Sequence, residues 1–278
     1  MSLVVSTPES DRVPEAYQLA ERLRLPCVAW EESGDSLVLA LQAGRLALMA
    51  RSRGRGEPVY VDFTAATALA RRQEGLKQDL SRAVGLKGGW RPMVLDATPG
   101  LGRDAFVLAA LGCRVTLIER SPVMHLLLED GLRRAEEVAL PELARMELVL
   151  GDAVNYLNHL SPHKRPDVIY LDPMHPERAK AALVKKEMRM LRMVVGEDGD
   201  ADGLLAMAMQ VARQRVVVKR PRLASPLGGR EADMRVEGRS VRYDLYFVAV
   251  AGTGNGGIIV TGDGGPKVPG GGSEAEPL

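Results

Sequence analysis

The chain has 278 residues, of which 46% are hydrophobic and 26% are charged, and its formal net charge is +1. This composition is ordinary for a globular protein with one sizeable α/β domain and a small accessory unit. A net charge so close to zero excludes a global attraction to nucleic acid, so any such binding must depend on local basic patches.

Neither the cysteines nor the apolar segments indicate an extracytoplasmic or membrane protein. Cys27 and Cys113 are far apart and lack metal-ligand spacing, so we expect no metal site and no disulfide. The first residues contain no basic segment followed by a long apolar one, and no apolar run reaches the ~18 residues that a membrane span needs. We therefore expect a cytoplasmic protein with no membrane partner.

Residues 1–64 predict a small α+β domain. A helix is expected over 13–24, and the segments 36–42 and 45–51 predict a β-hairpin that turns near Ala43 and Gly44. From residue 65 the pattern changes to short apolar strands that alternate with helices. Such alternation is typical of a parallel sheet covered by helices on both faces.

The second predicted domain covers residues 65–251. The expected strands are 94–96, 114–118, 146–150, 166–171, 215–219 and 241–250. The expected helices are 103–111, 122–137, 177–195 and 201–214. Residues 252–278 are rich in glycine and contain no aromatic residue, so they predict a disordered tail.

A glycine-rich loop lies between the first of these strands and its helix. The strand ends at Asp96, and Gly100 and Gly102 allow the chain to turn tightly and to approach a ligand closely. The helix that follows offers unpaired N–H groups at its N-terminus. The glycine spacing also satisfies the dinucleotide fingerprint, so the loop alone does not distinguish NAD from S-adenosylmethionine.

Acidic residues follow three further strands. Glu119, 17 residues beyond Gly102, is suited to accept hydrogen bonds from ribose hydroxyls, and Asp152 is placed to meet an adenine amino group. Asp172 ends the fourth strand, and Pro173 stiffens the turn behind it. This order predicts a class I, Rossmann-like methyltransferase fold that binds S-adenosyl-L-methionine, with a seven-stranded, mostly parallel sheet and an antiparallel last strand. An NAD-dependent oxidoreductase is the weaker alternative, because the four histidines supply no evident catalytic dyad.

Over residues 60–250 the sequence resembles the ribosomal RNA small subunit methyltransferase J family. The matching strings are 62–64, 82–89, 95–106, 118–122, 170–174, 182–189 and 216–221. The resemblance implies transfer of a methyl group from S-adenosylmethionine to the exocyclic N2 of a guanine in small-subunit (16S) rRNA, with that rRNA or the ribosomal subunit as partner. It also implies cofactor contacts from Arg103, Asp104, Glu119, Arg120, Asp152, Ala153 and Asp172. His175 stands where the family usually has phenylalanine, and segment 71–76 has fewer glycines than the family's loop.

The acceptor amine needs groups that orient it. We expect the Asp172 carboxylate and the Pro173 carbonyl to accept its two protons, while His175, or less readily Tyr170, stacks on the base. The basic residues expected to bind RNA are Arg71, Arg72, Lys185, Lys186, Arg189, Lys219 and Arg220. Methylation of adenine N6 or of a protein glutamine, and a non-catalytic RNA-binding role, remain alternatives. The oligomeric state stays open.

Overall fold

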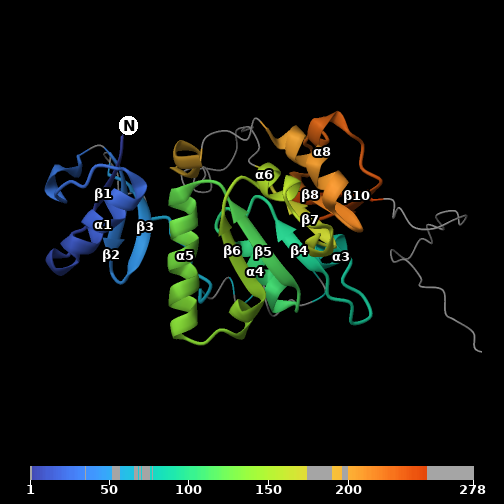
Figure 1. Cartoon of the computed structure of the whole chain (residues 1–278), viewed down its shortest axis with the longest axis horizontal. Coiled ribbons are helices and arrows are strands. Elements are labelled where there is room, and N and C mark those ends of the chain that lie inside the picture. Colours follow the sequence, from blue (N-terminus) through green and yellow to red (C-terminus); the bar gives the residue numbers. More distant parts are fainter. Residues whose placement is uncertain are drawn as a thin grey trace, which may run out of the picture.

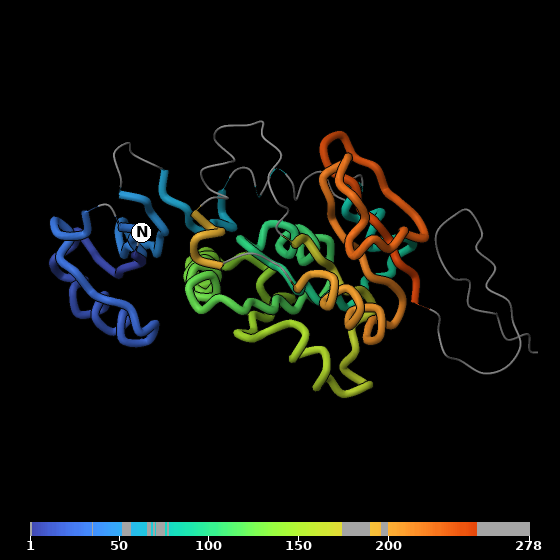
Figure 2. Tube along the Cα trace, turned by 90° about the horizontal axis from the view of Figure 1, so that it is seen from above, coloured from blue at the N-terminus to red at the C-terminus, as the bar shows by residue number. Residues whose placement is uncertain are grey.

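Two β-sheets organise the chain, and the long helix α5 (Pro122–Glu137) lies between them (Figure 1). Seen from above, the N-terminal elements form one end of the molecule and the last strands form the other (Figure 2). This computed structural model describes residues 2–34, 36–51, 57–65, 68, 70, 76, 78–173, 190–195 and 200–248. The predicted tail lies outside the described residues.

The first sheet belongs to the N-terminal unit. Its strands are β1 (Leu3–Ser6), β2 (Leu37–Gln42) and β3 (Arg45–Ala50). The predicted hairpin and helix are confirmed: β2 and β3 pair antiparallel, and α1 (Val13–Leu23) packs on β1. Ala43 and Gly44 both have positive φ, which the tight turn of such a hairpin requires. The sequence analysis missed β1, a four-residue strand that pairs in parallel with β2.

The second sheet has seven strands in the order β6-β5-β4-β7-β8-β10-β9. Its strands are β4 (Met93–Asp96), β5 (Arg114–Glu119), β6 (Met146–Leu150), β7 (Val168–Leu171), β8 (Arg215–Pro221), β9 (Met234–Glu237) and β10 (Val241–Phe247). The strands from β6 to β8 pair in parallel, whereas β10 is antiparallel to both β8 and β9. This confirms the predicted fold. The direction in which successive strands are added reverses between β4 and β7.

Helices cover both faces of this sheet. They are α3 (Asp79–Val84), α4 (Arg103–Ala110), α6 (Ala153–Asn158) and α8 (Ala201–Val211), together with α5. Val94 packs in the core shared with α3, α4 and α5, whereas its neighbour Leu95 packs in the core shared with α6 and α8. Because side chains alternate between the faces of a strand, only a continuous apolar run can fill both cores.

The helix expected before α8 and the strand β9 are the two points at which expectation and structure differ in this domain. The helix expected over 177–195 lies mostly outside the described residues, and only 190–195 are described as helical. Strand β9 was not located, because its side chains alternate only between partly buried and exposed, which leaves a weak apolar signal at the sheet edge. In the described part of the chain, no helix combines the length and apolar character needed to cross a membrane.

The N-terminal unit is attached to α5 by close packing. The amide of Leu46 on β3 donates a hydrogen bond to Asp130 Oδ2 (3.1 Å). At Gly131, in the middle of α5, an added Cβ would lie only 2.3 Å from Val61 Cγ1. A single hydrophobic cluster runs from β2 and β3 through this contact to α4 and α5. The sheets are thus separate while their cores are continuous, and the domain boundary at residues 64 and 65 stays a prediction.

The close approach at Gly131 predicts a stability effect of unusual sign. Glycine to alanine in a helix normally stabilises by about 1 kcal/mol. We expect Gly131→Ala instead to lower the free energy of unfolding by about 1–3 kcal/mol, because the added methyl overpacks against Val61. Gly203→Ala on α8 is the matched control, since no atom lies within 4 Å of its added Cβ. Denaturant titration measures both, and equal stabilisation of the two variants would contradict the packing.

Candidate active site

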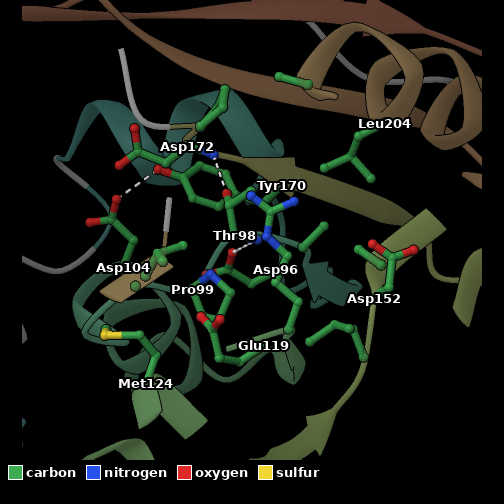
Figure 3. Close-up of a pocket in the computed structure, with 18 of the residues that line it drawn as sticks. Asp96, Thr98, Pro99, Asp104, Glu119, Met124, Asp152, Tyr170, Asp172 and Leu204 are labelled. Carbon is green, nitrogen blue, oxygen red and sulfur yellow. Dashed lines mark hydrogen bonds between the residues drawn. The ribbon is translucent and has the colours of Figure 1, made fainter. Parts of the chain in front are cut away.

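A cavity of about 420 Å³ opens at the carboxyl edge of the seven-stranded sheet (Figure 3). Its volume is in the range of small-ligand sites. It lies where the strand order reverses, between β4 and β7, which is where open α/β sheets bind ligands. The predicted cofactor-binding residues that line it are Asp96, Gly100, Arg103, Asp104, Glu119, Arg120, Asp152, Ala153 and Asp172. The remaining one, Gly102, stands at the start of α4 and is not among the lining residues.

The loop between β4 and α4 depends on its glycines. Gly100 and Gly102 have φ values of 53° and 71°, which a residue with a side chain adopts only at a cost. A Cβ at Gly102 would lie 2.9 Å from Leu128 and 3.0 Å from Phe63, whose ring stacks on Phe106 with 5.2 Å between centroids. At Gly100 no atom lies within 4 Å of the same position, so the loop backbone faces open space.

Two hydrogen bonds join this loop to the end of β7, and a third holds the loop itself. The amide of Ala97 donates to the carbonyl of Tyr170 (3.1 Å), and the amide of Asp172 donates to Thr98 Oγ1 (2.6 Å). Thr98 in turn donates its own amide to Asp96 Oδ1 (3.1 Å), as Figure 3 shows. Asp96 is 1% exposed, and burial raises its pKa well above the ordinary value. The buried Asp96 carboxyl therefore stabilises the loop conformation by accepting the hydrogen bond from the Thr98 amide.

The next two strand ends carry the predicted nucleoside contacts. Glu119 is buried, and its Oε1 accepts a hydrogen bond from the amide of Ser121 (2.8 Å). Asp152 caps α6, because its Oδ1 accepts from the amide of Asn155 (2.8 Å). These local bonds fix the orientation of both carboxylates at the cavity. Their predicted contacts with ribose and adenine stay predictions.

An ion pair lies at the side of the cavity that follows β5. Arg120 Nη1 is 2.9 Å from Asp200 Oδ2, and Asp200 immediately precedes α8. Both residues line the cavity, and both are partly exposed. In the described structure, the guanidinium of Arg120 thus already has an acidic partner from another element.

The opposite side of the cavity contains a cluster of four polar side chains. Tyr170 Oη donates to Asp104 Oδ2 (2.6 Å), and Lys219 Nζ donates to Asp104 Oδ2 (2.7 Å) and to Asp172 Oδ2 (2.9 Å). The Asp172 side chain is 41% exposed within the cavity, yet loss of hydration raises its pKa while Lys219 opposes that rise. The two carboxylates raise the pKa of Lys219, although burial works against them. The lysine is therefore protonated.

The structure places only some of the predicted RNA-binding and stacking residues, and those it places are largely buried. Lys219 points into the cavity, and Arg220 is 7% exposed with its guanidinium donating to the carbonyl of Ser225 (2.9 Å). Tyr170 is 1% exposed, so its ring does not lie on an open surface. Pro173 lines the cavity. His175, Arg71, Arg72, Lys185, Lys186 and Arg189 lie outside the described residues.

The sequence analysis did not predict the roles that two residues have in this cluster. Thr98 binds the amide of Asp172, and the hydroxyl of Tyr170 binds Asp104. A signal was present for Tyr170, because a phenol in a fully buried strand needs a hydrogen-bond partner. Nothing in the sequence identified that partner.

The cavity fits S-adenosylmethionine by its chemistry. Exposed loop backbone at Gly100 permits close approach, Glu119 suits hydroxyl groups, and Asp104 at the N-terminus of α4 suits an ammonium group. The family model described as putative SAM-dependent methyltransferase matches residues 18–248. A solved SAM-dependent methyltransferase from Neisseria gonorrhoeae superposes with a TM-score of 0.67 at 34% identity, covering 87% of this chain and 95% of that one. Fold and site define a class I S-adenosylmethionine-dependent methyltransferase.

Curated relatives narrow the class further. Ribosomal RNA small subunit methyltransferase J of Coxiella burnetii is 47% identical over 250 residues, covering 89% of this chain and 97% of that protein. The protein of the same name from Nitrosococcus oceani is 50% identical over 243 residues, covering 85% and 95%. The chain belongs to the ribosomal RNA small subunit methyltransferase J family. Its cofactor is S-adenosylmethionine, so the alternative of an NAD-dependent oxidoreductase is not supported.

The close packing around Gly102 predicts that a larger residue at this position weakens cofactor binding. Gly102→Ala places a side chain in a left-handed conformation and against Phe63 and Leu128, so we expect the affinity for S-adenosylmethionine to fall at least about tenfold. Gly89→Ala is the matched control, because its φ is 84° but no atom lies within 4 Å of the added Cβ. We expect this control to lose about 1–2 kcal/mol of stability and no affinity. Calorimetric titration separates the two, and equal affinities would contradict the assigned role of Gly102.

Proposed function

We propose that this protein transfers a methyl group from S-adenosylmethionine to the exocyclic N2 of a guanine in small-subunit ribosomal RNA. The names of its curated relatives support the RNA substrate. The position of Asp172 supports an amine as the acceptor: its carboxylate faces the cavity at the end of β7, beside the cofactor loop. Action on ribosomal RNA would place the protein in the cytoplasm, as the sequence predicts.

Asp172 and Pro173 would orient the acceptor amine. The lone pair of a guanine amino group is delocalised into the ring, so the amine is a poor nucleophile until it is aligned. The Asp172 carboxylate and the Pro173 carbonyl would each accept one N–H and turn the lone pair toward the cofactor. The hydrogen bond from the Asp172 amide to Thr98 fixes this backbone relative to the cofactor loop.

The protein need not build its own nucleophile. Bound S-adenosylmethionine supplies a methyl group already activated by its sulfonium. The residues of the chain would therefore contribute chiefly by positioning, for which ~7–11 kcal/mol is available in favourable cases. The carboxylate of Asp172 would add electrostatic support as positive charge develops on the amine.

We also propose that RNA contacts the turn after β8. Leu223 at its tip is 88% exposed, the largest exposed fraction among the described large apolar residues. The turn is held by hydrogen bonds from Ala224 to Pro221, from Arg222 to Ser240, and from the Arg242 guanidinium to the Arg222 carbonyl (2.7 Å). An apolar side chain held at the carboxyl edge is suited to fill the gap that a base leaves when it turns out of an RNA stack.

The test of the substrate is transfer of labelled methyl groups to four acceptors in parallel: small ribosomal subunits, naked ribosomal RNA, DNA and protein. We expect label in one of the two RNA samples and, after nuclease digestion, at N2 of one guanine. Label at adenine N6 or in protein would favour the alternative acceptors. Cofactor binding without transfer to any sample would favour a non-catalytic role.

Replacement of Asp172 tests the acceptor contact. We expect Asp172→Asn to lower the transfer rate by about 10²–10³-fold, the range for loss of one preorganised electrostatic contact. Calorimetry should find the affinity for S-adenosylmethionine changed by only a few-fold. Asp11→Asn, on the N-terminal unit and exposed, is the control with unchanged rate. Full activity of the Asp172 variant would remove this residue from the mechanism.

Replacement of Leu223 tests the RNA contact. A buried leucine contributes ~1.5–3 kcal/mol, so we expect Leu223→Ala to weaken RNA binding at least about tenfold and to leave cofactor affinity unchanged. Val138→Ala, at an apolar position that is 59% exposed beyond α5, is the control. Equal RNA affinities of the two variants would show that the turn does not touch RNA.

A further inference from the structure

We propose that Lys219 is a positioning residue for methyl transfer, which joins the carboxylate on the acceptor side to the carboxylate on the cofactor side. One ammonium group lies within hydrogen-bond distance of both Asp172 and Asp104. The proposal rests on the proposed role of Asp172 in holding the acceptor amine. It replaces the expectation that Lys219 binds RNA phosphate.

Strand register explains how Lys219 reaches both carboxylates. Leu171 on β7 is paired with Val218 on β8, so Asp172 and Lys219 are the next residues along adjacent parallel strands. Val217 packs in the core shared with α4, and Lys219, two residues on, points to the same face. Asp104 lies in the first turn of α4 on that face. The sheet therefore brings the three charges together through its backbone pairing.

The lysine lies between two acids whose charges act on each other. Asp104 raises the pKa of Asp172, and the negative charges of both residues also raise the pKa of the buried Asp96 on β4. Two cations lower the pKa of Asp172, namely Lys219 and, more weakly, Arg220. The phenol of Tyr170 on β7 faces the cluster, and Tyr243 on β10 lies near it. Lys219 thus favours the ionised form of Asp172 while it also lies within hydrogen-bond distance of Asp104.

The bond geometry also orients Asp172. Lys219 Nζ binds Oδ2 of Asp172, so Oδ1 is the oxygen that remains to accept an N–H from the acceptor amine. The lysine side chain is only 23% exposed, and two of its three N–H groups are directed at carboxylates. An ammonium group held in this way is poorly placed to bind a phosphate outside the cavity.

The direction of a pH effect follows from this arrangement. Lys219 lowers the pKa of Asp172 against the effect of desolvation. Removing the lysine therefore raises that pKa further. Because the amine contact needs the ionised carboxylate, activity that is lost on acidification would be lost at a higher pH in the variant.

The experiment compares the wild-type protein with Lys219→Met, Lys219→Gln and Lys219→Arg. For each, single-turnover transfer to ribosomal RNA is measured against pH, and RNA affinity is measured against salt. We expect the two neutral variants to lose at least about 100-fold in rate at pH 7, with the acidic limb of the pH profile at least 1 unit higher. Arginine should restore part of the rate and bring the limb back toward its wild-type position. The salt dependence of RNA binding should not change.

A matched variant, Arg222→Met, removes an exposed cation three residues away. Its side chain is 57% exposed, so we expect a smaller salt slope, as for loss of a phosphate contact, and an unmoved acidic limb. If Lys219→Met fails to fold, Lys219→Gln keeps a polar side chain and carries the same prediction.

Two results would overturn the role of Lys219. One is an unmoved acidic limb in the neutral variants, and the other is a reduced salt slope like that of Arg222→Met. Failure of the proposed function is separate, because it would appear as no transfer to ribosomal RNA by the wild-type protein.

Discussion

The junction between the ends of β4 and β7 is the constraint on which the site depends. Here the chain reverses the order in which it adds strands, and the two strand ends diverge into loops that must hold a ligand between them. Thr98 spans the gap: its amide is bound by Asp96 from one strand, and its hydroxyl binds the amide of Asp172 from the other. The glycine-rich loop and the turn at Asp172, which lie 74 positions apart in sequence, are therefore held at a fixed distance.

Much of this fold could be predicted because the sheet is buried on both faces. Short continuous apolar runs such as Val216–Val218 are typical of strands buried on both faces. A carboxylate at the end of such a run is easy to recognise in the sequence. The strands β1 and β9 escaped prediction for a physical reason. Each lies at the edge of its sheet and pairs with a single strand, so its stability depends strongly on that neighbour and less on its own pattern.

The sequence predicted which residues form the candidate site, but not which of them bind one another. The loop glycines and the acids on four strands follow from residue type and spacing. The partners of Lys219 do not, since they depend on which strand lies beside β8 and on which face of the sheet α4 packs. In sequence, a lysine followed by an arginine after an apolar run indicates a charged surface. In the structure, Lys219 and Arg220 point away from open solvent toward internal acceptors.

The position of α5 has a consequence for how the protein is made. This helix completes the core of the N-terminal unit, yet it lies more than seventy residues after β3 in the chain. The first fifty residues thus leave the ribosome before the surface that covers them exists. The part of the cluster that contains Leu46 and Leu48 lacks its cover from α5 until synthesis has passed residue 137. Nascent chains of this protein would then need protection early, and the two sheets would acquire their stability together.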